Sequence, residues 1–517
     1  MDIPSLFMIP SAVSSGKVHS VFPNSTDADF DFNRDSDATR VNSEGLIERV
    51  GYYGSELVTD GDFSSSSNWY IGTGCSISNG QAIFSSASSG SGFTGQNANA
   101  NICTIGKTYK VTFTIVSISE GGVKVRFPFN SSNVHTEAGT YTEYGVSTNA
   151  GIYIQNSGTT TAVIDNVSVV EVTGDRARLN YEIEGGLVNT KPSLLLEPQS
   201  SNLIPYSNPI EVSGGWQIFD NASIETNYEI SPMGIKNASL VGTQGGVNDF
   251  IFDSITISNS ATYTVSFYIK NIDSQATGFY APSAVDGRIN WNGAEISSIV
   301  GTGANYEELS NGWYRVHQTT TSTSTNVITR IYSDRVSTGS VLIFGYQLEE
   351  QSYPTSLIPT NGSTQTRSGE TCNGAGTSSI FESSEGILYA EYASLANDGS
   401  VRYLGLSDGS SGNRAVILND STTNNIRGIV SSGGTKYADF GFVVSDVTTF
   451  NKVALKWKAN DFQLWINGVK RVSDSAGPAP IGLNRFGFDL AGSGPIDAKI
   501  RDIRVYNTKE MTDSEVD

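Results

Sequence analysis

The stretch Thr108-Tyr-Lys-Val-Thr-Phe-Thr-Ile115 has an apolar or aromatic residue at every second position, and it returns 154 residues later as Thr262-Tyr-Thr-Val-Ser-Phe-Tyr-Ile269. Alternation with a period of two predicts a β-strand with one buried face. The distance between the two stretches fits the size of one β-sandwich. The sequence therefore predicts two related sandwich domains.

Two further pairs of segments accompany these stretches in the same order. A tryptophan segment precedes each copy, Ser67-Asn-Trp-Tyr70 in the first and Gly214-Gly-Trp-Gln217 in the second. A strand that leads into acidic residues closes each copy, at 163–171 and at 341–350. Three matches in one order are hard to explain by chance, so we interpret them as an internal repeat.

The rest of the chain carries the same kind of signal. Alternating runs also occur at 123–127 and 453–457, and turns rich in Gly, Ser, Asn and Asp separate such runs. No convincing amphipathic helix interrupts them. Many short strands without intervening helices favour antiparallel sandwiches or barrels. We therefore expect an all-β chain of tandem antiparallel jelly-roll β-sandwiches.

Composition excludes several classes of partner. The 517 residues include 32 Lys and Arg against 52 Asp and Glu, which gives a net charge of −20. Binding to nucleic acids and anionic membranes needs clustered Lys and Arg, and the sequence has no such run. We therefore expect neither as a partner. No stretch is long and apolar enough to span a membrane. The three cysteines, Cys75, Cys103 and Cys372, fit no metal or redox spacing, and we expect free thiols, with a disulfide between Cys75 and Cys103 as the alternative.

Residues in the first copy resemble the jelly-roll sandwiches of carbohydrate-binding modules. The resemblance rests on Glu56-Leu-Val-Thr-Asp-Gly-Asp-Phe63, on Trp69, on the Thr-Tyr-x-Val-x-Phe strand and on Ile164-Asp-Asn-Val167. It implies a sandwich with one sheet that can bind glycan through polar and aromatic side chains. Trp69, Trp216 and Trp313 are expected in the cores.

Alternation identifies side chains on the outer side of the sheets. In Val123-Lys-Val-Arg-Phe127 the apolar residues point inward, so Lys124 and Arg126 share the outer face, and the same reasoning exposes Tyr153 and Gln155. These four are the candidate carbohydrate-binding residues of the first copy, suited to an acidic or polar sugar. The alternative is an ordinary solvated sheet face. In the second copy the candidates are Trp291, Arg330 and Tyr332.

The same resemblance implies a structural calcium ion in the first copy alone. Asp165 lies on the closing strand and Glu56 on the matching first segment, and carboxylate oxygens are ligands that calcium prefers. The second copy has Phe344 near the equivalent place. The alternative is that Asp165 only caps a strand or makes a turn contact.

The last third of the chain resembles concanavalin-A-like or laminin-G-like sandwiches. This resemblance rests on the alternating strands around Trp457 and Trp465, on the turn Asn467-Gly468 and on the closing strand 500–507. Both tryptophans are expected in the core.

Two remaining segments resemble the N-terminal regions of tailed-bacteriophage virion proteins. They are 29–48, preceded by 5–11, and 177–181 together with 194–208. Each contains an Arg-Val-Asn or Arg-Leu-Asn step, at Arg40 and Arg178, followed by Gly-Leu. We expect two short β elements that lie side by side and link domains.

No catalytic pattern stands out. Sandwich-type glucanases place their acids alternately on one strand, and no Glu-x-Asp-x-Glu occurs here. No GxSxG, phosphate-binding loop or His-Asp-Ser arrangement is evident either. We therefore expect no enzyme.

These observations divide the chain into five parts. The expected parts are an anchoring or oligomerisation segment at 1–50, a first jelly roll at 51–173, a β linker at 174–200, a second jelly roll at 201–368 and a lectin-like sandwich at 369–517.

The resemblances imply a virion structural protein, a head or tail fibre or spike that is assembled in the host cytoplasm and binds host-surface or environmental glycans without catalysis. Its expected partners are other capsid or tail proteins, glycans and further copies of itself, with a trimer favoured by analogy. The alternatives are a purely structural decoration protein without a glycan ligand and a polysaccharide depolymerase.

Overall fold

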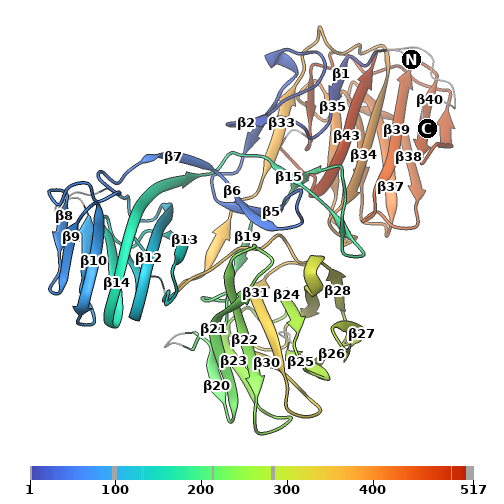
Figure 1. Cartoon of the computed structure of the whole chain (residues 1–517). Helices are drawn as coiled ribbons and strands as arrows, with labels where there is room; N and C mark the ends of the chain where they lie inside the picture. Colours follow the sequence, from blue (N-terminus) through green and yellow to red (C-terminus); the bar gives the residue numbers. More distant parts are fainter. Residues whose placement is uncertain are drawn as a thin grey trace.

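The computed structural model of the chain describes residues 3–95, 102–129, 131, 133–211, 215–280, 286–490 and 492–507. Within these residues the only helical elements are two short 3-10 turns, η1 (Thr26–Ala28) and η2 (Ser310–Gly312). All other regular structure is β-strand, and every strand pairing is antiparallel apart from one isolated bridge. None of the described residues forms a helix that could span a membrane. The strands build three β-sandwiches (Figure 1), which confirms the predicted all-β class.

The first sandwich is built around two long antiparallel strands, β12 and β14, which curve through several bulges in their pairing. Its strands are β7 (Tyr52–Glu56), β8 (Trp69–Ile71), β9 (Cys75–Ser78), β10 (Gln81–Ala87), β11 (Gly92–Gly95), β12 (Thr108–Phe127), β13 (Gly139–Val146) and β14 (Ile152–Thr173). The order β13-β12-β14-β10-β9 is extended by β11, which pairs with β14 and β8, and by β7, which pairs with β14. Trp69, Phe84, Phe93 and Phe113 are buried in its core.

The second sandwich consists of two six-stranded sheets, β20-β23-β30-β25-β26-β27 and β21-β22-β31-β24-β29-β28. Its strands are β20 (Gln217–Phe219), β21 (Ala222–Ile230), β22 (Lys236–Thr243), β23 (Phe250–Thr256), β24 (Thr262–Asn271), β25 (Ala276–Tyr280), β26 (Asp286–Asn292), β27 (Glu295–Val300), β28 (Ala304–Glu308), β29 (Tyr314–Thr321), β30 (Asn326–Tyr332) and β31 (Ser340–Glu349). Trp216 is fully buried between the sheets.

The internal repeat is visible in the strand pairing. The repeated stretches form the first part of β12 and most of β24, and each pairs with the closing strand of its own copy. Ile115 lies opposite Ile164 in the first sandwich, and Ile269 lies opposite Ile343 in the second. The sequence match therefore corresponds to the same pair of central strands in both sandwiches.

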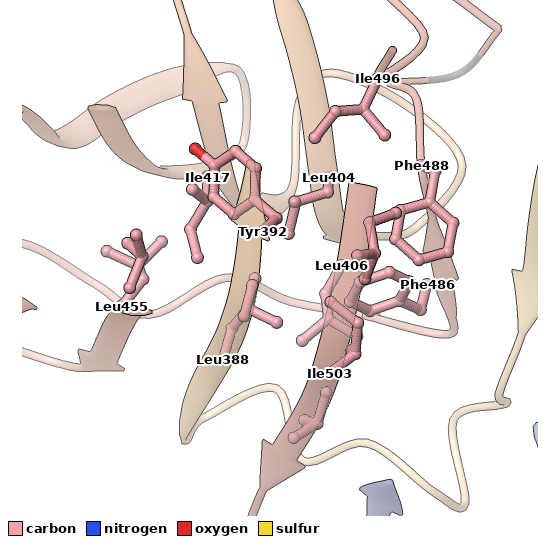
Figure 2. Packing of buried hydrophobic residues seen from close by; sticks show 14 of the residues in the cluster. Leu388, Tyr392, Leu404, Leu406, Ile417, Leu455, Phe486, Phe488, Ile496 and Ile503 are labelled. Carbon is pink, nitrogen blue, oxygen red and sulfur yellow. The ribbon is translucent and has the colours of Figure 1, made fainter. Parts of the chain in front are cut away.

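The third sandwich contains the C-terminal strands. They are β33 (Thr371–Ala375), β34 (Glu385–Ser394), β35 (Arg402–Ser407), β36 (Arg414–Asn419), β37 (Asn425–Ser432), β38 (Thr435–Val443), β39 (Asn451–Lys458), β40 (Phe462–Ile466), β41 (Val469–Asp474), β42 (Arg485–Gly487) and β43 (Ala498–Tyr506). Figure 2 shows how Leu388, Leu455 and Ile503 from one sheet meet Leu404 and Phe486 from the other. Trp457 and Trp465 are buried, as predicted.

The third sandwich also takes strands from the beginning of the chain and from the linker. These strands are β1 (Leu6–Met8), β2 (Val13–Ser14), β3 (Lys17–Val18), β4 (Phe30–Asn33), β15 (Arg178–Asn180) and β18 (Ser193–Leu196). β1 and β18 pair with β43, and β4 pairs with β33. The division into separate parts at 1–50 and 174–200 is corrected accordingly. The physical reason is burial, because the alternating pairs Leu6/Met8 and Phe30/Phe32 need the third core to cover them.

Short β elements lie at the place where the three sandwiches meet (Figure 1). They are β5 (Ala38–Val41), β6 (Ile47–Val50), β16 (Ile183–Glu184), β17 (Leu187–Val188), β19 (Ser200–Asn202) and β32 (Gln365–Arg367). The segments after Arg40 and Arg178 do lie side by side, as predicted. Tyr181 N–H donates to the Val41 carbonyl at 3.0 Å, and Val41 N–H donates to the Asn180 amide oxygen at 2.9 Å.

A buried ion cluster of Arg34, Arg178, Arg367, Glu197 and Glu370 joins these segments. Arg34 Nη1 lies 2.8 Å from Glu370 Oε1. The Arg178 guanidinium pairs with both Glu197 and Glu370. Arg367 Nη1 lies 3.0 Å from Glu197 Oε2. Their side chains are at most 4% exposed. Burial alone raises the pKa of Glu197, yet Arg367 and Arg178 hold that pKa below its ordinary value.

Replacing Glu370 with Ala is expected to destabilise the protein by about 3–5 kcal/mol, because it leaves the buried Arg34 guanidinium without a carboxylate and removes one of the two carboxylates that pair with Arg178. Urea unfolding followed by tryptophan fluorescence measures the loss. Glu137→Ala is the matched control, since Glu137 pairs with Lys236 at 3.1 Å on the surface and such pairs contribute little. Equal effects of the two variants would contradict a structural role for the buried ion cluster.

Asp253 is a buried acid in the second sandwich. It lies on β23 between the core residues Ile251 and Ile255, and its Oδ2 has no hydrogen-bond partner among the described residues. Burial raises the pKa of Asp253 to about 6. The unfolded value is about 3.9, so the folded state holds this proton more tightly. The Asp253 carboxyl therefore makes its full contribution to the free energy of unfolding below about pH 4, and this contribution is lost as the pH rises through about 6.

Asp253→Asn is therefore expected to raise the melting temperature (Tm) of the second sandwich at pH 7–8, and the gain should vanish below about pH 4. Thermal unfolding of both proteins between pH 4 and pH 8 measures this difference. Asp220→Asn, at an exposed position, controls for the loss of one negative charge. A gain that does not change with pH would show that ionisation of Asp253 is not its cause.

Candidate ligand-binding faces

The first face is the outer side of β8, β11, β14 and the end of β12, and we define it by Tyr70, Lys124, Arg126, Tyr153 and Gln155. Lys124 lies opposite Gln155 in the pairing of β12 with β14. The intervening residues Val123, Val125, Ile152 and Ile154 are fully buried on the other side of the sheet. The structure thus brings together the four residues that alternation predicted.

Sequence reasoning missed Tyr70. Its neighbour Trp69 is buried, so the side chain of Tyr70 points outward, and 63% of it is exposed. Strand β11 pairs with β8 on one side and with β14 on the other, and the residue opposite Tyr70 also lies opposite Tyr153. The two tyrosines therefore belong to the same transverse row of the sheet.

Tyr153 and Gln155 are held by one loop carbonyl. The Tyr153 hydroxyl donates to Gly90 O at 2.5 Å, and Gln155 Nε2 donates to the same oxygen at 3.2 Å. Gly92 lies opposite Gln155, and a Cβ there would lie 2.8 Å from the Tyr153 ring and 2.1 Å from Ile154 O. Glycine is required at this position because any side chain would collide with the Ile154 carbonyl and the Tyr153 ring.

The second face is the outer side of β20, β23, β30 and β25. Inward-pointing neighbours such as Ile251, Phe279 and Ile331 are fully buried. We define the second face by the residues that point the other way, which are Phe219, Phe250, Phe252, Tyr280, Arg330 and Tyr332.

Aromatic rings cover much of the second face. The rings of Phe219 and Phe250 stack with centroids 4.5 Å apart and an interplanar angle of 10°. Phe250 also contacts Tyr332, whose ring lies 5.8 Å from that of Tyr280. The Arg335 guanidinium lies 4.3 Å from the Tyr332 ring and covers it, so Tyr332 is only 4% exposed.

Arg330 provides the positive charge at the centre of this face. Its guanidinium lies 4.8 Å from the Phe250 centroid and 5.1 Å from the Tyr280 centroid, and Nη1 donates to the Tyr332 hydroxyl at 3.2 Å. Its Nε is buried without a hydrogen-bond partner among the described residues. No described carboxylate forms an ion pair with it. An arginine held in this way can pair with an anionic group of a ligand.

Trp291 does not belong to the second face, contrary to prediction. Its indole packs against the core of the second sandwich, donates to Thr277 Oγ1 at 2.9 Å and contacts the Tyr314 ring. Trp291 follows the buried Ile289 by two residues on β26, so alternation already places both on the inner side. The missed residues Phe250 and Phe252 flank the buried Ile251 and were detectable by the same reasoning.

The two faces occupy equivalent sheets of the repeated sandwiches. In each copy, the strand at the tryptophan segment pairs with a later strand of the outer-face sheet. These pairs are β8 with β11 in the first copy and β20 with β23 in the second. The end of β12 matches β25, and the beginning of β14 matches β30. The repeat therefore presents cationic and aromatic side chains twice in the same architectural position.

The expected calcium ligands are not arranged as a cation site. Glu56 Oε1 accepts hydrogen bonds from the N–H groups of Leu57, Val58 and Val169, and Oε2 accepts one from Ser168 Oγ at 2.5 Å. Asp165 accepts from Asn166 N–H at 2.7 Å, which matches the alternative of a turn contact. In the part of the chain that the structure describes, no three His, Cys, Asp or Glu side chains group closely enough to hold a metal ion.

A cleft of about 920 Å³ lies between the first two sandwiches. The two cations that line it are already paired with acids: Lys107 Nζ lies 2.6 Å from Glu171 Oε1, and Arg49 pairs with Asp37. The Arg49 guanidinium also lies 4.5 Å from the Tyr144 ring. These pairs leave the two faces as the better candidates for binding.

Comparison with known proteins gives limited matches. No protein-family model and no curated protein matches the chain. Among solved structures, the chain is similar to the CBM40 module of the Ruminococcus gnavus IT-sialidase bound to α2,3-sialyllactose, with 17% identity, a TM-score of 0.24, and coverage of 28% of this chain and 85% of the other. The tandem CBM22-1–CBM22-2 of Paenibacillus barcinonensis Xyn10C matches with 8% identity, a TM-score of 0.18, and coverage of 58% and 98%. Function is therefore inferred from the two faces.

We expect chelation with EDTA to leave the Tm of the first sandwich unchanged, because the Glu56 carboxylate is already occupied by protein donors. Thermal unfolding with and without EDTA at constant ionic strength tests this. A lower Tm that calcium chloride restores would reinstate the calcium site around Asp165 and Glu56.

Proposed function

We propose that this chain is a glycan-binding protein whose two repeated sandwiches bind saccharides on their outer faces without cleaving them. The observation that carries the proposal is the second face, where Arg330 lies between two aromatic rings and has no described carboxylate partner. Sugars present C–H groups that pack on aromatic rings and hydroxyl groups that hydrogen-bond with polar side chains. The arginine adds affinity for a carboxylate or sulfate on the sugar.

The first face supports the same activity with different chemistry. Lys124 and Arg126 supply charge, and Tyr70 supplies an exposed ring. Two sites in one chain gain affinity from multivalency, which raises avidity by roughly 10²–10⁴ when both bind one polymer. A shallow sheet face that is weak by itself therefore becomes effective on a polysaccharide.

We extend the proposal to a location on the virion of a tailed phage, in a head or tail fibre or spike that forms homo-oligomers. Its support is the resemblance of segments 29–48 and 194–208 to virion proteins. Both segments reach the region where the three sandwiches meet, and β4 and β18 complete the third sandwich. The binding faces lie on the other two sandwiches, which leaves them free when the third contacts capsid or tail proteins.

Absence of glycosidic cleavage is part of the proposal. Glycosidases need two carboxyl groups on either side of the scissile bond. The residues that define the two faces include no carboxylate, and they suit binding better than hydrolysis. A decoration protein without a ligand and a depolymerase are the competing functions.

The test is a glycan array and a host-polysaccharide pull-down with the full-length protein, in which bound protein and released sugar are measured from the same samples. Arg330→Ala is expected to lower retention of acidic glycans at least tenfold, since it removes the cation at the centre of the second face. Lys124→Ala with Arg126→Ala is expected to lower binding through the first face.

Lys458→Ala is the matched control, because it removes an exposed cation from the third sandwich. Retention that neither face variant changes would remove the binding assignment and favour a structural decoration protein. Release of sugar by the unaltered protein would favour a depolymerase.

A further inference from the structure

A chain of hydrogen bonds links Ser14, His19 and Asp29 in the nine-stranded sheet of the third sandwich, where Ser14 ends β2, His19 directly follows β3 and Asp29 directly precedes β4. Ser14 Oγ lies 2.8 Å from His19 Nε2, and His19 Nδ1 lies 2.8 Å from Asp29 Oδ2. The residues next to them, Val18 and Phe30, are fully buried in the core. The three polar side chains therefore share the outer side of this sheet, away from both binding faces.

The order of the three groups matches that of a nucleophile, a base and an orienting acid. With a proton on Nδ1, which donates to Asp29, the lone pair of His19 Nε2 faces the Ser14 hydroxyl. The second oxygen of Asp29 accepts from Ser20 N–H at 3.0 Å, so the carboxylate is fixed from both sides. The sequence alone gives no sign of this arrangement, because Ser14 and Asp29 come together only through the pairing of β2 and β4 with β3.

The arrangement is accessible to a substrate. The Asp29 side chain is 10% exposed, whereas that of His19 is 37% exposed. The acid is thus sheltered and the base can be reached from solvent. The N–H group of Ser15, the residue after Ser14, makes no hydrogen bond to any described residue. Lys17, opposite Ser14 in the hairpin, lies on the same side of the sheet, where its ammonium group pairs with Asp31 at 2.5 Å.

We propose that Ser14 is an activated nucleophile that hydrolyses small acyl esters. Ser14 Oγ attacks the ester carbonyl while His19 Nε2 takes the hydroxyl proton, and the carbonyl π electrons move to the oxygen. The bond from the acyl carbon to the alcohol oxygen then breaks, and Nε2 returns the proton to the leaving alcohol. Water, deprotonated by Nε2, attacks the acyl-Ser14, so that the carboxylic acid leaves and the serine is restored.

The open setting selects the class of substrate. A site on the outer side of a sheet has room for a short acyl group such as acetyl, either on a sugar hydroxyl or on another alcohol. Ester cleavage leaves glycosidic bonds intact, so this activity goes beyond glycan binding and does not depend on it. An O-acetylated polysaccharide and a small free acetyl ester carry the same ester bond, so the test measures acetate release from each of them separately.

The test uses the full-length protein with a fluorophosphonate probe, p-nitrophenyl acetate and an O-acetylated polysaccharide. Peptide mapping of the unaltered protein is expected to place the probe on Ser14. Ser14→Ala should abolish labelling and acetate release, and His19→Ala should lower both about 100-fold, the size of effect expected for a general base. Ser11→Ala, which removes an exposed serine of the same segment, is the control and should change neither.

Mapping on the unaltered protein does not depend on how the variants fold. Thermal unfolding of His19→Ala and Asp29→Asn separates loss of reactivity from loss of structure, because a purely structural role would lower the Tm together with labelling. Labelling of Ser14 no faster than that of other exposed serines would overturn the proposal. Acetate release from p-nitrophenyl acetate alone would limit the substrate to small free esters, and release from the polysaccharide as well would identify sugar acetates.

Discussion

The pairing of three buried arginines with two buried glutamates is the constraint on which the arrangement of this chain depends. Arg34 comes from the first segment, Arg178 and Glu197 from the linker, and Arg367 and Glu370 from the connection between the second and third sandwiches. A buried charge without its partner is costly, so these distant segments must come together for any of them to be stable. The cluster thereby fixes where the sandwiches meet.

The same constraint explains why the chain is not a simple series of domains. The first segment and the linker both return to the third sandwich, where β1 and β18 pair with successive parts of one side of the final strand β43 and β34 pairs with its other side. The first and second sandwiches are insertions between strands that belong to the third. The two inserted sandwiches, which carry the candidate faces, therefore project from a part whose strands come from both ends of the chain (Figure 1).

The repeat shows how one architecture carries two different surfaces. In each sandwich, alternate residues of the outer-face sheet support the core, so these positions stay apolar. The residues between them are free to change, and the first face has Lys124 and Arg126 where the second has a cluster of rings around Arg330. Two faces with different chemistry on one chain suit a polymer whose sugars are not all alike.

Local sequence determined the features that follow from the pleat of a strand. The period of two distinguished Lys124 and Arg126 from their buried neighbours and revealed the repeat. Applied to Trp291, the same period places its side chain on the inner side of the sheet. Five of the six residues that define the second face flank a fully buried residue in the same strand and could be found in this way, although the sequence prediction named only Arg330 and Tyr332 among them.

Only the tertiary structure decided which strands are neighbours. The membership of β1 and β4 in the third sandwich, the five-member ion cluster and the approach of Ser14 and His19 to Asp29 all depend on pairing between segments. The direction of a side chain is a local property of the backbone, whereas the choice of a partner strand depends on which apolar surfaces remain to be buried across the whole chain.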